Sequence, residues 1–229
     1  MDNRFPLKAL VWDLDGTIIH FKINSTKARK AAIGILVSHG INKKNLSIKK
    51  SILDNLEISK NLFEQKGLSL EQINEIFKNI DKKISLFEHK AALNAKMIDG
   101  IEDVLIFASY NNLRQAIYTF NKYKHAKLSL EKVNLLKYFD IIIGRDNVIN
   151  PKPHPDHLLE ICHKLGVKPN EIMVIGDNYR DIEGALNVGA SSVGVHTKLA
   201  KVDTLQKADE IVNEKEIPLK LIDVIKKRL

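Results

Sequence analysis

Five short apolar runs, separated by helix-like segments, set the strongest limit on how this chain can fold. The runs lie at residues 8–13, 116–120, 139–144, 171–177 and 191–197. Between them, apolar residues recur at three- and four-residue spacing, which is typical of amphipathic helices. Because strands that alternate with helices connect through right-handed crossovers, we expect an α/β fold with a parallel sheet covered by helices on both faces. Residues 208–229 add the pattern of an edge strand followed by a closing helix.

Residues 22–96 interrupt this alternation, because they contain no convincing strand pattern. Apolar residues there recur at helical spacing in three segments, at 26–40, 47–67 and 69–93. Ser47 and Ser69 are expected to cap the second and third helices, neither with a complete capping box. We therefore expect an all-helical insert at 22–96 and a core formed by 1–21 and 97–229. Since only short segments join the two, the insert is expected to be a hinged lid.

Charge and cysteine content exclude several classes of protein. The formal net charge is +8, but the lysines are spread along the chain, and the only short basic run is KKR at 226–228. No aromatic residues interleave with it, so we expect no nucleic-acid partner. A small phosphorylated substrate would be attracted by the same positive field. The single cysteine, Cys162, excludes a disulfide framework and a cysteine-based zinc site.

The first residues and the hydropathy predict a cytoplasmic protein without a membrane partner. The opening MDNRFPLKAL has no basic start, no long apolar run and no small-residue cleavage site. No apolar run of about 18 residues, as a membrane-spanning helix requires, occurs elsewhere. The sequence leaves open whether the protein is a monomer or a homodimer.

Two carboxylates meet where the first predicted strand ends. Asp13 and Asp15 flank Leu14 in the sequence VWDLDGTII. Since side chains alternate along a strand, both point to the same side before Gly16 turns the chain. Like charges this close resist joint ionisation, so one carboxyl is protonated or a divalent cation lies between them. An Asp-Gly pair alone would indicate a turn, but D-x-D-G-T after an apolar strand arises by chance only about a few times in a thousand such chains.

At this loop the chain resembles the haloacid dehalogenase-like hydrolase superfamily, whose phosphatase members begin with D-x-D-G-T. Three later motifs follow in the order of that family. Thr119 ends a strand in AIYTF, Lys152 precedes a helix in KPHP, and Asp177 and Asp181 form the acidic pair of GDNYRD. The resemblance covers essentially the whole chain outside the insert. It implies a Rossmann-like catalytic core and a small helical cap inserted between the first and second motifs.

The resemblance also implies a role for each matched residue. Asp13 is expected to attack phosphorus and form an aspartyl-phosphate. Asp15 is expected to protonate the leaving alcohol and then deprotonate the hydrolytic water. Thr119 and Lys152 are expected to bind the phosphoryl group and to offset its charge. A Mg²⁺ ion is implied, held by the carboxylates of Asp13 and Asp177 and the backbone carbonyl of Asp15. Asp181 is expected to bind it either directly or through a water.

Two segments depart from the common family pattern. His20 and Phe21 lie just before the insert, where His20 either contacts the substrate or is a surface histidine. Phe120 follows the motif threonine, so Asn121 stands one position later than in many relatives, and its contact with the substrate is left open.

Three histidines that follow Lys152 show no metal-ligand spacing and are expected on the surface: His154, His157 and His163.

The implied function is Mg²⁺-dependent hydrolysis of a small phosphorylated metabolite, as in phosphoglycolate phosphatases. A phosphomutase of the same superfamily is the alternative, because it would keep both aspartates and a similar cap. A haloacid dehalogenase would not need Asp15, and a nucleic-acid-binding or regulatory module would leave the whole set of motifs unexplained. A closing cap would exclude water during phosphoryl transfer and would leave no room for a folded protein or a duplex.

Overall fold

The computed structural model describes residues 6–20, 23–197 and 204–229. The chain divides into two compact units, one formed by Met1–Lys22 with Ala92–Leu229 and the other by Ile23–Ala91. The insert was expected at 22–96, and its first residue, Lys22, lies outside the described residues. None of the described helices combines the length and the apolar character needed to cross a bilayer.

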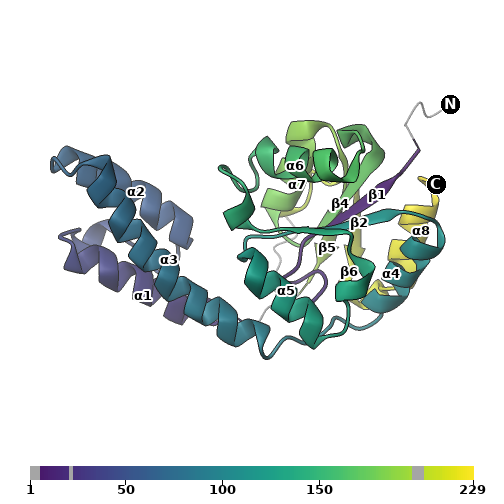
Figure 1. The fold of residues 1–229 in the computed structure, drawn as a ribbon, viewed down its shortest axis with the longest axis horizontal. Helices are drawn as coiled ribbons and strands as arrows, with labels where there is room; N and C mark the ends of the chain where they lie inside the picture. The colour runs from purple at the N-terminus through teal and green to yellow at the C-terminus, as the bar shows by residue number, and fades with distance from the viewer. Residues whose placement is uncertain (1–5, 21–22, 198–203) are drawn as a thin grey trace. The chain divides into compact units, whose positions relative to one another are not determined.

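Figure 1 shows the sheet of the first unit. It has six strands in the order β3-β2-β1-β4-β5-β6. Every neighbouring pair is parallel, which confirms the expected Rossmann-like α/β fold and the edge position of the last strand. The strands are β1 (Ala9–Trp12), β2 (Arg114–Tyr118), β3 (Ile141–Ile143), β4 (Ile172–Gly176), β5 (Ser191–His196) and β6 (Glu210–Asn213).

Helices cover both faces of this sheet. One face packs against α4 (Ile101–Tyr110), α5 (Tyr123–Lys132) and α8 (Leu219–Lys226). The other packs against α6 (Pro155–Leu165) and α7 (Tyr179–Val188). Short 3₁₀ helices complete the unit at Leu136–Tyr138, Arg145–Asn147, Pro169–Glu171 and Glu214–Glu216.

The amphipathic pattern over residues 125–139 predicts one continuous helix, but the helix α5 covers only the first part of it. It ends at Lys132, and Asn134 adopts a left-handed backbone conformation with φ 58°. A left-handed residue just past the last turn is a common helix terminator, and asparagine tolerates it better than most residues. The apolar spacing after Lys132 therefore belongs to a separate 3₁₀ helix.

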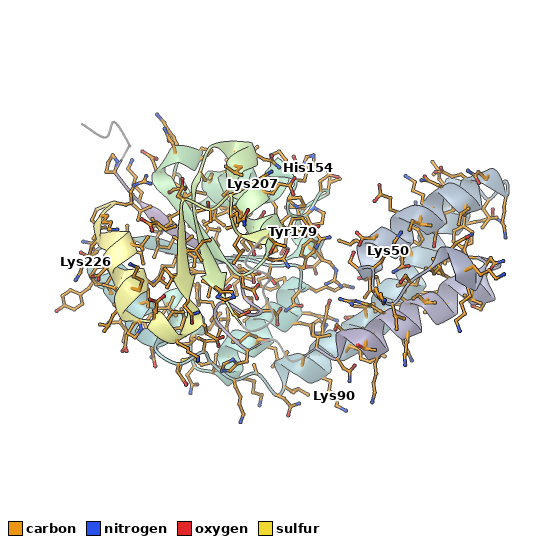
Figure 2. The ribbon with its side chains drawn as sticks, turned by 180° about the vertical axis from the view of Figure 1, so that it is seen from behind. Lys50, Lys90, His154, Tyr179, Lys207 and Lys226 are labelled. Carbon is orange, nitrogen blue, oxygen red and sulfur yellow. The ribbon has the colours of Figure 1, made fainter. Side chains whose placement is uncertain are left out.

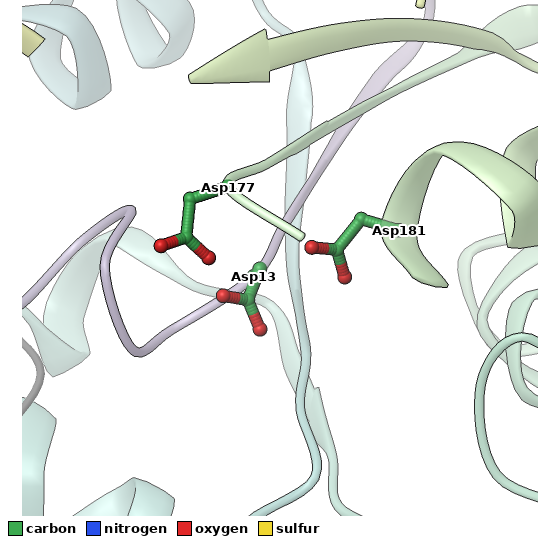
Figure 3. A group of neighbouring side chains, drawn as sticks. All are labelled: Asp13, Asp177 and Asp181. Carbon is green, nitrogen blue, oxygen red and sulfur yellow. The ribbon is translucent and has the colours of Figure 1, made fainter. Parts of the chain in front are cut away.

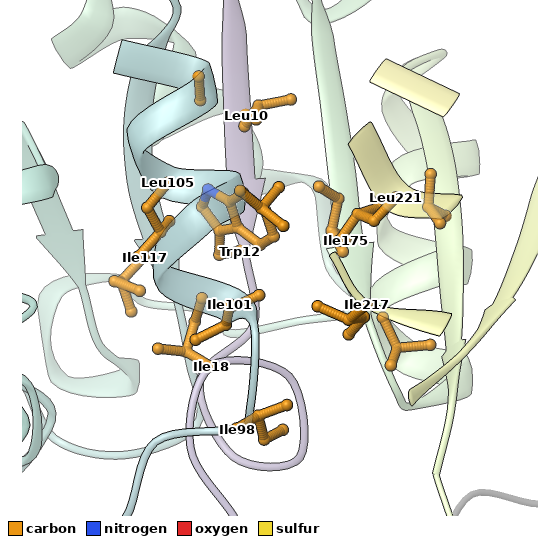
Figure 4. Close-up of a cluster of buried hydrophobic side chains, with 14 of the residues drawn as sticks. Leu10, Trp12, Ile18, Ile98, Ile101, Leu105, Ile117, Ile175, Ile217 and Leu221 are labelled. Carbon is orange, nitrogen blue, oxygen red and sulfur yellow. The ribbon is translucent and has the colours of Figure 1, made fainter. Parts of the chain in front are cut away.

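Side chains of the central strand β1 alternate between the two cores. Leu10 and Trp12 lie in the cluster with α4 and α8, while Ala9 and Val11 lie in the cluster with α6. Figure 4 shows Trp12 in the first cluster. Its indole N–H donates to the side-chain oxygen of Gln115 at 3.2 Å, so this buried polar group is paired. Two-sided burial fixes the strand whose end carries Asp13.

The second unit is built from three α-helices around a core of its own. They are α1 (Ser25–Ser38), α2 (Ile52–Gln65) and α3 (Leu70–Ala92), with a 3₁₀ helix at Lys43–Asn45. The core includes Leu36, Phe63, Ile73 and Ile80. Figure 2 shows lysines on both units, among them Lys50, Lys90, Lys207 and Lys226.

The helix caps of this unit differ from the prediction. Ser51, not Ser47, caps α2, and it forms a capping box with Asp54. Ser69 precedes α3 as expected. The backbone N–H of Ser69 donates to the side-chain oxygen of Gln72 at 2.8 Å, and the backbone N–H of Gln72 donates to the Ser69 hydroxyl oxygen at 3.3 Å. Ser69 and Gln72, three residues later, therefore form a complete capping box. The prediction that Ser69 lacks one was wrong.

Candidate active site

Three neighbouring strands bring the predicted residues to one edge of the sheet. Asp13 follows β1, Thr119 follows β2 and Asp177 follows β4. Strand β1 lies between the other two. The carboxyl ends of parallel strands meet at the same edge, where open α/β sheets form their ligand sites. Motifs that are far apart in the sequence therefore share this edge.

Asp13, Asp177 and Asp181 form a compact group of carboxylates (Figure 3). One oxygen from each lies within 4.8 Å of the others. Asp181 stands in the first turn of α7, where the Asn178 N–H donates to it at 3.0 Å. Thr197 donates to Asp177 at 3.5 Å. Hard oxygen donors gathered in this way fit a divalent cation such as Mg²⁺.

Two glycines allow this close packing. Gly16 has φ +93°, and a Cβ there would lie 2.1 Å from Asp177 Oδ2. A Cβ on Gly176 would lie 2.3 Å from Asp181 Oδ2. Both distances are far below van der Waals contact, so any side chain would displace a carboxylate. The glycines of the D-G-T and G-D motifs are thus required by the space around the acidic group.

The ammonium of Lys152 neutralises part of this charge. It donates to Asp13 Oδ1 at 2.5 Å, to Asp181 Oδ1 at 2.6 Å and to the carbonyl oxygen of Tyr118 at 2.9 Å. An ammonium has three N–H donors, so all three are used. Burial alone would lower the pKa of Lys152, but the charges of Asp13 and Asp181 outweigh it and raise the pKa. Lys152 is therefore a permanent cation.

The carboxyl groups of Asp177 and Asp181 hold their protons more tightly than ordinary aspartates. Burial raises the pKa of Asp177 to about 8, and the charges of Asp13 and Asp181 add to this effect. Burial also raises the pKa of Asp181 to about 7, although Lys152 opposes the rise. Near neutral pH, protons therefore compete with a cation for these oxygens.

Asn121 contacts the predicted acid/base residue. Its side-chain N–H donates to Asp15 Oδ2 at 2.5 Å, and its backbone N–H donates to the Thr119 hydroxyl oxygen at 3.1 Å. Thr119 and Asn121 are both buried, and Asp15 is half-buried. The later position of Asn121 in the motif still brings it to the site, where it orients Asp15. Its contact with a substrate stays a prediction.

The side chain of His20 contacts Glu214, which is not one of the predicted site residues. Its Nδ1 lies 3.6 Å from Glu214, and its backbone N–H donates to the carbonyl of Lys96. The role of His20 in substrate binding therefore stays a prediction. Phe21 lies outside the described residues.

The expectation for the three later histidines holds for two of them. His154 and His163 are exposed, but His157 is fully buried. It precedes Leu158 and stands one helical turn before Ile161, two apolar residues on the buried face of α6. That spacing was a signal for burial, since residues four apart share a helix face.

Comparison with known proteins supports a single family. The family model described as "Haloacid dehalogenase-like hydrolase" matches residues 10–195. Phosphoglycolate phosphatase from Escherichia coli (strain K12) is 42% identical over 66 residues, which are 29% of this chain and 26% of that protein. The chain thus matches only about a quarter of the length of these curated relatives.

Solved structures share the fold at low identity. A β-phosphoglucomutase from Clostridium difficile superposes with a TM-score of 0.72 at 22% identity, covering 96% of this chain and 97% of that one. A predicted phosphoglycolate phosphatase from Haemophilus somnus superposes with a TM-score of 0.63 at 19% identity, covering 94% and 97%.

Mg²⁺ binding should tighten as the pH rises, because the cation takes the deprotonated forms of Asp177 and Asp181. Isothermal titration is expected to show an affinity gain of at least about tenfold between about pH 6 and pH 8.5. Proton release, measured in buffers of different ionisation enthalpy, should be larger at the lower pH. Asp177→Asn should bind more weakly and with a smaller pH dependence. An affinity that is constant over this range would contradict the assignment of the raised pKa values to the cation site.

Proposed function

The chain belongs to the haloacid dehalogenase-like hydrolase family, and from this premise we propose that it is a Mg²⁺-dependent phosphohydrolase that acts on a small phosphorylated metabolite. The proposal rests mainly on the position of Asp13, which accepts a hydrogen bond from the Lys152 ammonium. Asp15 follows two residues later and accepts a hydrogen bond from the side chain of Asn121. A dehalogenase would have no use for the second carboxylate. A nucleophilic carboxylate with a separate acid/base carboxyl beside it fits phosphate ester hydrolysis through an aspartyl-phosphate.

In the proposed reaction, Asp13 and Asp15 divide the chemistry. A carboxylate oxygen of Asp13 attacks phosphorus, the bond to the leaving alcohol oxygen breaks, and Asp15 gives that oxygen its proton. The product is an aspartyl-phosphate. Water then attacks phosphorus, Asp15 takes the proton of the water, and the bond to Asp13 breaks. Inorganic phosphate leaves, and both aspartates return to their starting state.

The surrounding residues would lower the cost of bringing two anions together. Mg²⁺ would be held by Asp13, Asp177 and Asp181 with the Asp15 carbonyl, and when bound it supplies the positive charge that offsets the repulsion between nucleophile and phosphate. Lys152 supplies a second positive charge from within the protein. The hydroxyl of Thr119 accepts from the Asn121 N–H, so its own proton can be donated to a phosphoryl oxygen.

Substitution of the two aspartates should separate the two steps. Asp13→Asn should lower kcat for p-nitrophenyl phosphate by roughly 10⁴-fold or more, because the nucleophile is lost. Asp15→Asn should lower kcat by about 10²- to 10⁴-fold. It should still release one p-nitrophenolate per enzyme in a rapid burst, since that leaving group needs no proton.

The control for these variants is Asp223→Asn, on the exposed side of α8, which should retain full activity. Removal of the cation with EDTA should abolish turnover, and added Mg²⁺ should restore it. Robust hydrolysis by Asp13→Asn, or turnover indifferent to EDTA, would rule out the proposed mechanism.

The substrate class is proposed as a small phosphorylated metabolite of the phosphoglycolate type. The name of the Escherichia coli relatives supports this choice, and the likeness to a β-phosphoglucomutase keeps a phosphomutase as the alternative. The two differ in what attacks the aspartyl-phosphate: water in a phosphatase, a sugar hydroxyl in a mutase. A panel of phosphorylated metabolites with Mg²⁺ should release inorganic phosphate. Isomerisation of a hexose 1-phosphate without phosphate release would favour the mutase instead.

We also propose that the helical unit Ile23–Ala91 acts as a cap that closes during turnover. Its support is its place in the sequence, between the first and second motifs, and its own packed core. Closure would exclude water and select small substrates. Small-angle X-ray scattering should show a smaller radius of gyration with Mg²⁺ and orthovanadate than without them. An unchanged radius at saturation would count against a closing cap.

A further inference from the structure

His157 is a fully buried histidine that no step of the proposed reaction uses. It lies in the first turns of α6, five residues after Lys152. Buried histidines are uncommon unless both ring nitrogens are satisfied, because an unpaired polar group in the interior is costly. The partners of its two nitrogens therefore indicate what the residue does.

Each ring nitrogen of His157 has a partner of one fixed type. Nε2 lies 2.9 Å from the carbonyl oxygen of Ile143, which can only accept, so Nε2 carries the proton. Nδ1 lies 3.2 Å from the backbone nitrogen of Lys152, which can only donate, so Nδ1 is bare. An imidazolium has two donors and would break the second bond. Only the neutral Nε2–H tautomer satisfies both contacts.

The surroundings favour this neutral form. Burial lowers the pKa of His157 to about 4, the Ile143 carbonyl works against this shift, and the positive charge of Lys152 adds to it. The ring of Tyr118 packs edge to face against the imidazole, with the centroids 4.5 Å apart at 67°. The carboxylates of Asp13 and Asp181 bind Lys152 at its far end, on the ammonium.

His157 constrains Lys152 at both of its ends. It accepts directly from the Lys152 backbone N–H. Through its packing it also holds Tyr118, whose carbonyl accepts from the ammonium at 2.9 Å and whose ring lies 4.6 Å from it. A lysine side chain is long and flexible. Because His157 fixes both the backbone of Lys152 and Tyr118, which contacts the ammonium, it limits the positions that the charge can adopt.

We propose that His157 is a positioning residue for the reaction: as the neutral Nε2–H tautomer it fixes the backbone of Lys152 and thereby keeps the ammonium on Asp13 and Asp181. The kinetic consequence rests on the proposed function. The tautomer and the ammonium contacts do not, so they can be tested separately.

Two substitutions divide the contacts of His157 between them. His157→Asn keeps an acceptor where Nδ1 stands and loses the bond to Ile143; His157→Gln keeps a donor near Nε2 and loses the acceptor for Lys152. Each leaves one buried backbone group unpaired, so their losses of stability should be similar. His157→Phe retains the ring and loses both bonds. His163→Phe, on the exposed face of the same helix, is the control.

Across the variants, kcat is expected to depend on whether position 157 keeps an acceptor for the Lys152 backbone N–H, and not on the melting temperature. His157→Asn should keep a kcat close to that of the unsubstituted protein, while His157→Gln and His157→Phe should lose about 10- to 100-fold in kcat with little change in KM. His163→Phe should change neither constant. Equal kcat values for His157→Asn and His157→Gln would reduce His157 to a purely structural residue and overturn the proposal.

Nitrogen-15 NMR tests the same point without turnover. The imidazole spectrum of His157 should show a bare Nδ1 and a protonated Nε2 between about pH 5 and pH 8. The Lys152 ammonium signal should be visible through slow exchange in the unsubstituted protein and in His157→Asn, and lost in His157→Gln. A protonated Nδ1 at neutral pH, or an ammonium signal unaffected by His157→Gln, would overturn the proposal. If no phosphate ester is hydrolysed at all, the proposed function fails, and these spectra alone decide the role of His157.

Discussion

The contact of one buried ammonium with two carboxylates is the interaction on which the rest of the site depends. The topology brings Asp13, Asp177 and Asp181 to one edge of the sheet, where their charges would repel one another in a poorly solvated space. The ammonium of Lys152 lies between two of them and donates all three of its N–H groups to protein oxygens. Removing one partner of such a buried group leaves uncompensated charge, which typically costs about 3–5 kcal/mol. Gly16 makes room for the same arrangement.

Most of the fold could be predicted from the sequence because its pattern is locally consistent. The apolar runs lie in a sheet buried on both faces, and each predicted strand is found within a few residues of its expected bounds. The errors occurred where a single residue decides the local structure. Asn134 ends α5 by adopting a left-handed conformation, and Gln72 completes a capping box that the spacing from Ser69 permits.

The residues of the candidate site could be named from the order of the family motifs, but their contacts could not. The bond from Asn121 to Asp15 joins residues that are distant in the sequence, so it depends on the register of β1 against β2. The burial of His157 depends on which face α6 turns to the sheet. Sequence spacing shows which residues share one face of a helix. It does not show what that face packs against, because that depends on the tertiary structure. The acidic group follows from the same packing, because its three carboxylates come from two strand ends and one helix.

Thermal unfolding of Lys152→Met at about pH 8, with EDTA and with excess Mg²⁺, tests most directly whether the ammonium holds the carboxylates together. Methionine keeps an unbranched side chain of similar length and removes the charge. In EDTA the variant should be less stable than the unsubstituted protein by about 3–5 kcal/mol, and Mg²⁺ should stabilise the variant more than the unsubstituted protein, because the cation takes over part of the charge balance. Equal stability of the two proteins in EDTA, or an equal gain from Mg²⁺, would contradict this account.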